Sequence, residues 1–402
     1  MTNENSEKTY QKLKEKAKEA IDASNTELAL EIYQEAEKLF PEEAEIPKEI
    51  GNLYLDKVDY ELAKFYYLKS LELNPNYVNA LQGLGNIYKD TGDLELAAQT
   101  FQKELEINPD YAPAYYGLAQ VRYLEKRDDE IEDLFKKALQ LEPNNARTCH
   151  ALALYYIRIT NNLSEAKRLL QIGLLNEERN SKVLNGEIYD TLALIARKEE
   201  RRNDEETLLL KALEYNSEIR RANHYLGYVY YNQEKYEKAL DYWKKYFQLC
   251  KSFKETPDSK TIQYMSKCVR CLRRVSEEIP FYHDLLDVNP RFSEALYALG
   301  FYYGENGECE KGIFYLQQIS DSEPTLFGDN YIAHAYFALG CCYQSLVEVE
   351  KAVENYEKAI DLEPSYTYGG FDNMADLYED CGNIEKAEFY RKQVTEMEKD
   401  RQ

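Results

Sequence analysis

Residues 83–109 read GLGNIYKDTGDLELAAQTFQKELEINP, a stretch in which two runs of apolar residues at helical spacing flank the short polar break KDTGDL. Pro109 closes the stretch. Because proline cannot continue a helix, it resets the chain for the next element. The stretch therefore predicts one helix, a tight turn and a second helix.

The same pattern occurs on both sides of this stretch. EIGNLYLDKVDYELAKFYYLKSLELNP occupies residues 49–75, and GLAQVRYLEKRDDEIEDLFKKALQLEP occupies residues 117–143. The closing prolines are spaced by 34 residues and are Pro41, Pro75, Pro109 and Pro143. A chain of 402 residues would otherwise suggest several globular domains, but an internal repeat indicates a stack of similar units without a single core.

Small and aromatic residues return at fixed points of this pattern. Glycines lie midway along the first helix, at Gly51, Gly85, Gly227, Gly300 and Gly340. Alanines lie at the facing point of the second helix, at Ala63, Ala97, Ala239, Ala352 and Ala387. A larger side chain there would push the helices apart, at a cost of about 1–3 kcal/mol. Tyrosines are expected to fill the gap to the neighbouring repeat, at Tyr54, Tyr88, Tyr230, Tyr303, Tyr343 and Tyr378.

This pattern resembles the tetratricopeptide-repeat family over nearly the whole chain. About eleven repeats begin near residues 10, 44, 78, 112, 146, 186, 220, 259, 293, 333 and 367. The resemblance implies an all-α fold, a right-handed superhelical solenoid of helix-turn-helix repeats. It also implies that the first helices line a concave groove while the second helices form the outer wall.

The repeats are expected to fall into four groups after an N-terminal lead at residues 1–9. The groups are residues 10–180 with five repeats, 186–253 with two, 259–326 with one degenerate and one regular repeat, and 333–402 with two repeats and a capping helix. The three short insertions between them are the expected hinges, at 181–185, 254–258 and 327–332.

Two repeats depart from the pattern. The repeat that begins near residue 146 carries one extra residue in RITNNLSEA and has no closing proline. The repeat that begins near residue 259 matches least, because Glu278 stands where alanine is expected and Pro280 is expected to cut into its second helix.

Charge and composition bear on partners and location. The net charge is −23, so the chain as a whole repels nucleic acid and anionic lipid, and neither is expected as a partner. The start, MTNENSEKTY, has no apolar signal core, and no run of 18 apolar residues occurs, so a soluble, cytoplasmic protein is expected. The eight cysteines, including the pair Cys268 and Cys271, are expected to be mainly small buried apolar residues rather than disulfides or metal ligands.

The charge is unevenly distributed along the chain. Residues 1–145 hold 17 basic and 30 acidic residues, a net charge of −13. Residues 146–285 hold 24 basic and 20 acidic residues, a net charge of +4. Residues 286–402 hold 9 basic and 23 acidic residues, a net charge of −14. The family resemblance places the groove-facing residues at positions 2, 5, 9, 12 and 13 of each repeat.

At those positions the central repeats carry a basic and aromatic set that forms the candidate partner-binding groove. Its members are Arg147, His150, Arg158, Arg197, Lys198, Arg221, His224, Tyr228, Tyr231, Lys260, Lys267 and Arg270. Arginine suits bidentate contact with carboxylate or phosphate, and tyrosine supplies rigid contact area. This set therefore predicts an acidic or phosphorylated partner segment. The alternative is that these charges are solvated and pair with glutamates on adjacent helices.

No catalytic function is expected. The sequence contains no GxSxG, GxxxxGK[ST] or HExxH motif, none of the four histidines has a ligand at metal-binding spacing, and no cofactor is implied. A protein-binding scaffold or adaptor is the main prediction, and a regulatory peptide-sensing solenoid that controls a partner protein is the alternative. Self-association between the basic centre and the acidic ends is a further expectation.

One specialised form of peptide binding is disfavoured. Some members of the family hold the C-terminal carboxylate of heat-shock chaperones with a clamp of five residues. Lys48 and Asn52 match its first two members, but Gly83, Pro113 and Gly117 occupy the other three positions. Two matching residues are too few to hold a carboxylate.

Overall fold

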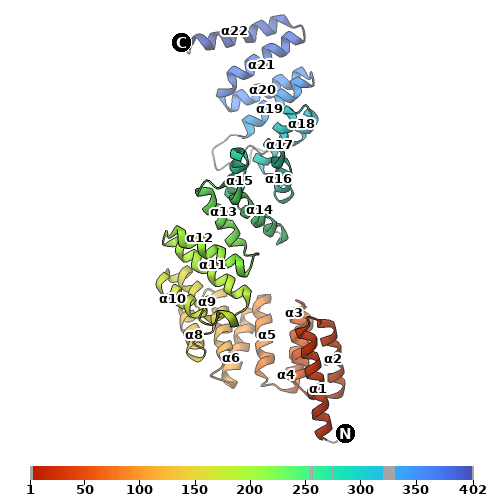
Figure 1. Ribbon diagram of the computed structural model, residues 1–402. Coiled ribbons are helices and arrows are strands. Elements are labelled where there is room, and N and C mark those ends of the chain that lie inside the picture. Colours follow the sequence, from red (N-terminus) through yellow and green to blue (C-terminus); the bar gives the residue numbers. More distant parts are fainter. Residues whose placement is uncertain (1–2, 254, 256, 273–274, 320–330, 401–402) are drawn as a thin grey trace. The chain divides into compact units, whose positions relative to one another are not determined.

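The computed structural model describes residues 3–253, 255, 257–272, 275–319 and 331–400, and within these ranges all regular structure is helical (Figure 1). The prediction of an all-α fold is therefore confirmed. The helices follow one another as helix-turn-helix pairs, consistent with about eleven repeats. The chain divides into two compact units, residues 1–201 (the N-terminal unit) and residues 202–402 (the C-terminal unit).

The N-terminal unit contains five helix pairs and one further helix. Within each pair the two helices pack against each other, and each pair packs on the next. The helices are α1 (Asn3–Asp22), α2 (Thr26–Leu39), α3 (Glu45–Asp56), α4 (Tyr60–Leu73), α5 (Val78–Thr91), α6 (Leu94–Ile107), α7 (Ala112–Leu124), α8 (Asp128–Leu141), α9 (Ala146–Tyr155), α10 (Leu163–Gly173) and α11 (Lys182–Lys198).

The C-terminal unit begins with one helix and continues as five pairs. These helices are α12 (Arg202–Tyr215), α13 (Arg220–Asn232), α14 (Tyr236–Ser252), α15 (Ser259–Leu272), α16 (Val275–Val288), α17 (Ser293–Glu305), α18 (Cys309–Leu316), α19 (Tyr331–Ser345), α20 (Val349–Leu362), α21 (Thr367–Asp380) and α22 (Ile384–Asp400). The boundary between the two units falls between α11 and α12, inside the repeat expected to begin near residue 186.

Polar caps and a left-handed residue define the turn inside a pair. The side chain of Asp59 accepts a hydrogen bond from the backbone N–H of Leu62 at 3.1 Å, which satisfies a free donor at the start of α4. Just before such caps the backbone adopts positive φ at the same repeat position, at Ser24, Val58, Gly92 and Lys126. The 34-residue period is therefore visible in the backbone itself.

An aromatic ring fills the narrow space between the two helices of a pair. Tyr67 of α4 is fully buried, and a Cβ atom added to Gly51 or Gly83 would come within 2.9 or 2.3 Å of its ring. Phe101 of α6 lies in the same way against Gly85 and Gly117. Glycine is needed at these points because a ring from the second helix occupies the space, which links one repeat to the next.

The recurring tyrosines of the first helices stack mainly within their own repeat. Tyr54 lies 5.6 Å from Tyr66, centroid to centroid, with the ring planes 12° apart. Three further pairs of this kind are Tyr230 with Tyr242, Tyr303 with Tyr315, and Tyr378 with Tyr390. Tyr54, Tyr230, Tyr303 and Tyr378 thus have a stacking partner on the second helix of their own pair, and Tyr343 accepts a hydrogen bond from Gln317 of the preceding repeat at 2.9 Å.

The two irregular repeats are accommodated in different ways. The extra residue of the repeat near 146 is absorbed by a π-helix at Tyr156–Thr160, in which the wider turn takes up one residue. The prediction that Pro280 cuts into its helix is wrong, because α16 continues through it from Val275 to Val288. A proline removes one backbone hydrogen bond and kinks a helix without always ending it.

The expected insertions also have distinct outcomes. Residues 181–185 form the cap and first turn of α11, where the Ser181 hydroxyl accepts from the N–H of Leu184 at 3.2 Å. Residues 254 and 256 lie outside the described part of the chain, as do 327–330, while α19 begins at Tyr331. Glu278 belongs to α16, and its side chain also lies outside the description.

Candidate partner-binding groove

The predicted groove residues divide between the two compact units. Arg147, His150, Arg158, Arg197 and Lys198 lie on α9, the π-helix and α11 of the N-terminal unit. The C-terminal unit holds the remaining residues, on α13 and α15, namely Arg221, His224, Tyr228, Tyr231, Lys260, Lys267 and Arg270.

Both histidines of the predicted groove connect the first helices of neighbouring repeats. His150 Nε2 lies 2.9 Å from the Thr191 hydroxyl oxygen, and that hydroxyl donates to the carbonyl of Glu187 at 2.8 Å. The histidine Nε2–H therefore donates to Thr191. His224 Nε2 repeats this arrangement at 2.6 Å from the Thr261 hydroxyl oxygen. This contact gives both side chains a structural role between repeats.

The arginines and lysine of the N-terminal unit are exposed. Arg147 stands on the first turn of α9, and its charge opposes the rise in pKa that burial causes in the carboxyl group of Glu187. Arg158 donates to the Tyr123 hydroxyl at 3.3 Å, and Lys198 Nζ donates to Asn161 Oδ1 at 3.4 Å. These long contacts to neutral groups leave both cations able to meet an anion.

In the C-terminal unit three of the predicted residues, His224, Tyr228 and Tyr231, contact a fully buried tryptophan, Trp243 of α14. Tyr228 meets the Trp243 ring edge to face at 5.2 Å, and Tyr231 packs on Tyr264 at 4.6 Å, centroid to centroid. The Trp243 indole N–H donates to the carbonyl of His224 at 3.0 Å. The tyrosines of this set thus contribute to an aromatic cluster that joins α13, α14 and α15.

Cations border this cluster. The ammonium of Lys260 lies 5.9 Å from the Tyr264 ring centroid, and that of Lys267 lies 5.9 Å from the Tyr231 centroid. Tyr228 also donates to Asp258 at 3.3 Å, so a carboxylate is close to this part of the set. Arg197 and Arg221 each interact with another group of the chain. The side chain of Arg270 lies outside the described structure.

A cleft of about 690 Å³ runs across the first helices of the N-terminal unit. Its walls include repeat positions 2, 5, 9, 12 and 13, and its polar members are Gln82, Asn86, Lys89, Asp90, Tyr111, Tyr116, Gln120, Glu142, Asn145, Arg147 and Thr148. The Gln82 Oε1 atom is buried and has no hydrogen-bond partner within the described chain. A polar cleft of this kind can accept the backbone of an extended peptide.

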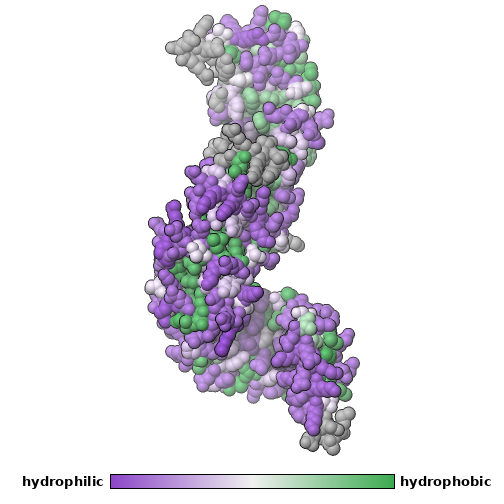
Figure 2. Space-filling model, viewed as in Figure 1, coloured by the Kyte–Doolittle hydropathy of each residue, from purple (hydrophilic) through white to green (hydrophobic). Residues whose placement is uncertain are grey.

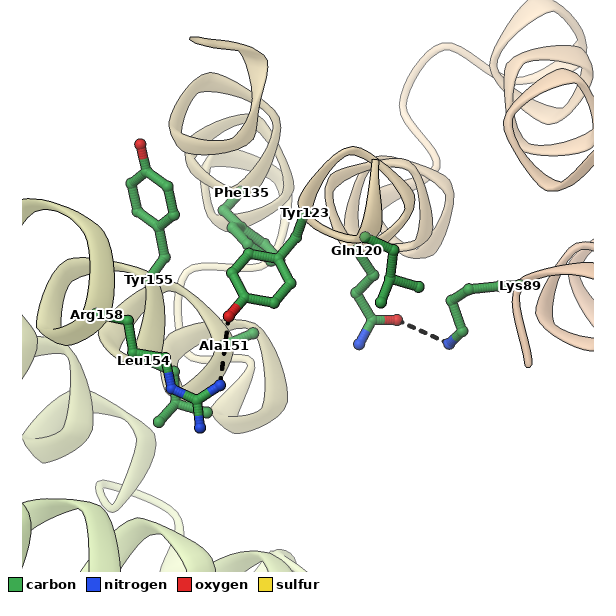
Figure 3. Close-up of a pocket in the computed structure, with 9 residues that line it drawn as sticks. Lys89, Gln120, Tyr123, Phe135, Ala151, Leu154, Tyr155 and Arg158 are labelled. Carbon is green, nitrogen blue, oxygen red and sulfur yellow. Dashed lines mark hydrogen bonds between the residues drawn. The ribbon is translucent and has the colours of Figure 1, made fainter. Parts of the chain in front are cut away.

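A smaller apolar pocket of about 230 Å³ adjoins the cleft and shares Lys89 and Gln120 with it (Figure 3). Figure 3 shows Tyr123 reaching toward Arg158 while Gln120 and Lys89 meet on the other side of the pocket. Of the nine lining residues, the prediction from sequence named only Arg158. Four of the others stand at the same repeat positions in the repeats near 78 and 112, namely Lys89, Gln120, Tyr123 and Leu124, and could have been found there.

The two residues that match the chaperone clamp are engaged within the fold. Lys48 is buried and lies 2.5 Å from Glu49 Oε1. Asn52 accepts from the Tyr67 hydroxyl at 2.7 Å and donates to Glu49 at 2.9 Å. Gly83 and Gly117, which replace two other clamp members, accommodate the rings of Tyr67 and Phe101.

The thiols and the surface add two observations. Cys149, Cys250, Cys268, Cys309 and Cys342 are buried, whereas Cys381 is exposed. Among described residues no group of histidine, cysteine or carboxylate side chains is arranged to hold a metal ion. The visible face of the chain is mostly hydrophilic with smaller hydrophobic patches (Figure 2), and none of the described helices combines the length and apolar character needed to cross a membrane.

Models of known families match two regions of the chain. A model described as a TPR repeat matches residues 85–125, and models described as a tetratricopeptide repeat match residues 66–99, 49–77 and 333–366. A search of curated proteins finds no match.

Several solved structures resemble parts of the chain. PilF of Pseudomonas aeruginosa is 18% identical over 53% of this chain and 92% of its own, with a TM-score of 0.47. A tetratricopeptide repeat protein from Parabacteroides merdae is 16% identical over 65% of this chain and 99% of its own, with a TM-score of 0.47. YrrB, described as a TPR protein with an unusual peptide-binding site, is 19% identical over 48% of this chain and 96% of its own, with a TM-score of 0.34.

Proposed function

We propose, from the premise that this chain belongs to the tetratricopeptide-repeat proteins, that it is a non-catalytic scaffold or adaptor that binds a segment of a partner protein along its first helices. Proteins of this family generally bind other proteins or peptides. The observation that carries the proposal is the cleft of about 690 Å³ in the N-terminal unit, whose walls present amides, a tyrosine hydroxyl and cations. Such groups bind a peptide without acting on it chemically.

The charge of the predicted groove supports an acidic or phosphorylated segment as the occupant. Arg147 and Arg158 are exposed on the first helix of the repeat near 146, and guanidinium groups bind carboxylate and phosphate in bidentate fashion. The central residues 146–285 are the part of the chain with a net positive charge. An acidic segment is therefore attracted to this part, and Arg147 brings its positive charge to the end of the cleft.

The experiment reverses three charges at once. A variant with Arg158→Glu, Arg197→Glu and Arg221→Glu should retain its helical circular dichroism and lose the partners that wild type captures, as measured by quantitative mass spectrometry after pull-down. A matched control carries Lys16→Glu, Lys103→Glu and Lys137→Glu, three exposed positions outside the predicted groove. Equal capture by both variants and wild type would remove the proposal.

A salt titration distinguishes this function from nucleic-acid binding. Binding of an acidic segment that meets only a few cations, with aromatic and amide contacts beside them, should weaken only modestly between low and physiological salt. Binding of a nucleic acid should fall steeply, because it releases one counterion for each neutralised phosphate. A steep decline would favour nucleic acid over the scaffold.

A further inference from the structure

The apolar pocket of the N-terminal unit lies where the two repeats that begin near residues 112 and 146 meet. Tyr123 and Leu124 come from the end of α7, Phe135 comes from α8, and Ala151 and Leu154 come from α9. Lys89 of α5 and Arg158 of the π-helix stand at its edges (Figure 3). Leu124 is 50% exposed, so the apolar wall is accessible from outside.

The size of the pocket limits what can occupy it. Its volume of about 230 Å³ is below the range of about 300–1,000 Å³ typical of sites for drug-sized ligands. It suits one large apolar side chain, and single anchors of this kind supply much of the affinity in protein interfaces.

The charged residues around the pocket indicate which residue type stands next to that apolar residue in the partner segment. The nine lining residues include two cations, Lys89 and Arg158, and no carboxylate. Lys89 Nζ donates to Gln120 at 2.9 Å and lies 3.5 Å from Asp90, whereas Arg158 donates only to the neutral Tyr123 hydroxyl among the contacts of the described chain. Residues 1–145 carry a net charge of −13. The pocket edge formed by Lys89 and Arg158 is nevertheless locally positive and complements an anion.

The adjoining cleft supplies the contact for the peptide backbone. The buried Gln82 Oε1 has no donor within the described chain, and an unsatisfied buried acceptor costs free energy that an incoming N–H would recover. The cleft carries the carboxylates of Asp90 and Glu142 beside its cations, whereas the pocket lining has no carboxylate, so the pocket is the more favourable place for an anionic group.

We propose that the pocket and cleft together recognise an extended partner segment in which one large apolar residue stands next to an acidic residue. The apolar side chain enters the pocket, the carboxylate meets Arg158 and Lys89, and a backbone N–H donates to Gln82 in the cleft. This inference rests on the proposed scaffold function and specifies its ligand.

The experiment selects peptides from a random twelve-residue display library on the full-length chain and measures synthetic copies of the winners by fluorescence anisotropy. Three variants alter the pocket: Ala151→Phe fills it, Leu124→Asp places a carboxylate at its wall, and Arg158→Glu reverses its charge. Leu124 and Arg158 are exposed, so these two variants keep the test valid if Ala151→Phe fails to fold. Leu39→Asp and Lys103→Glu are the controls, because Leu39 is 49% exposed on α2 and Lys103 is exposed on α6.

The selected peptides are expected to share an aromatic or long aliphatic residue next to Asp or Glu. Their dissociation constants should rise by about tenfold or more with each pocket variant that folds and stay unchanged with both controls. Winners that lack this pair, or that bind the pocket variants as tightly as wild type, would overturn the inference.

The outcomes also separate this inference from the function on which it rests. One outcome is that selected peptides bind the pocket variants as tightly as wild type but fail to bind a variant with both Arg197→Glu and Arg221→Glu. That result would support the scaffold function and refute recognition by the pocket. Failure to select any peptide, or winners insensitive to all of these variants, would count against both.

Discussion

At the scale of single residues, the turn inside each helix pair sets a backbone geometry that some residues adopt more easily than others. The turn residue has positive φ at Val58, at 60°, and at Gly92, at 88°. Glycine takes up this left-handed conformation without steric cost, whereas a β-branched side chain is strained there. Val58 is 66% exposed, so its side chain gains little burial in return.

Replacing Val58 with glycine is therefore expected to stabilise the chain by about 1 kcal/mol, because relief of strain outweighs the greater freedom of glycine in the unfolded state. The reverse change at the equivalent position, Gly92→Val, should destabilise it by a similar amount. Urea unfolding followed by circular dichroism measures both. A lower midpoint for Val58→Gly would show that the turn is not strained.

A second residue with an unusual environment is Glu104 of α6. Its side chain is fully buried, neither carboxylate oxygen has a hydrogen-bond partner in the described structure, and burial raises its pKa to about 9. The same repeat position holds alanine elsewhere, at Ala36 and Ala138, which are also buried. The carboxyl group therefore stays protonated in the folded chain at neutral pH.

This environment predicts a pH dependence with a definite sign. Between its ordinary value of 4.5 and about 9, Glu104 binds a proton in the folded state and loses it on unfolding, so stability falls as pH rises through this window. Glu104→Gln should be more stable than wild type near pH 7, by up to the order of 3 kcal/mol, and the difference should shrink toward pH 4. Unfolding midpoints of both proteins from pH 4 to pH 9 measure this, and parallel curves would contradict it.

At the scale of helices, the contact between repeats depends on an aromatic ring held by glycines. The ring of Tyr67 on α4 lies against Gly51 of its own repeat and Gly83 of the next. Gly227 and Gly340 face Trp243 and Tyr356 in the same way. Because the Tyr67 ring is fully buried and protein interiors are close-packed, even a methyl group at Gly83 would disturb the packing.

Gly83→Ala should accordingly destabilise the chain by about 1–3 kcal/mol, since the new Cβ would lie 2.3 Å from a Tyr67 ring carbon. Gly173→Ala is the matched control, because its Cβ would meet neighbours at ordinary distances of 3.4 Å and beyond. Combining Gly83→Ala with Tyr67→Leu should recover part of the loss. Equal midpoints for the two single glycine variants would refute this account of the interface.

Much of the helix arrangement could be predicted from sequence, because particular residues mark it. Pro75, Pro109 and the alternating apolar runs fix where helices begin and end, and so the helix pairs were predicted correctly. The rings of Tyr67 and Phe101 were missed as partners of the glycines, because a glycine in sequence signals close approach without saying which atom approaches. The π-helix at 156–160 was likewise unforeseen, because one extra residue can be placed in a turn as easily as in a helix.

The candidate site was harder to predict than the fold. Selecting basic residues identified Arg158 but not Tyr123 or Leu154, which form the pocket beside it. Two of the selected residues, His150 and His224, instead bond to threonines of the following repeat. Charge in a sequence does not distinguish a residue that is free to bind from one that its neighbours already hold.

At the scale of the whole molecule, the distribution of charge predicts self-association. The ends of the chain carry net charges of −13 and −14, and residues 146–285 carry +4. Copies of the chain should therefore attract one another weakly at low ionic strength and separate when salt shortens the Debye length to about 8 Å. Sedimentation velocity at low and at physiological salt measures this, and a coefficient that does not change with salt would argue against it.

The fixed period of the ring-and-glycine contact has a consequence for how such a chain can change in length. Gly117 occupies the position one period after Gly83, and each accepts a ring from the preceding second helix. If residues 76–109 were excised, Tyr67 would meet Gly117 instead of Gly83, and the new junction would reproduce the old one. The molecule can thus lose or duplicate this whole period while the joint keeps a compatible partner, whereas a shift of one residue needs a wider helical turn to absorb it, as the π-helix at 156–160 does.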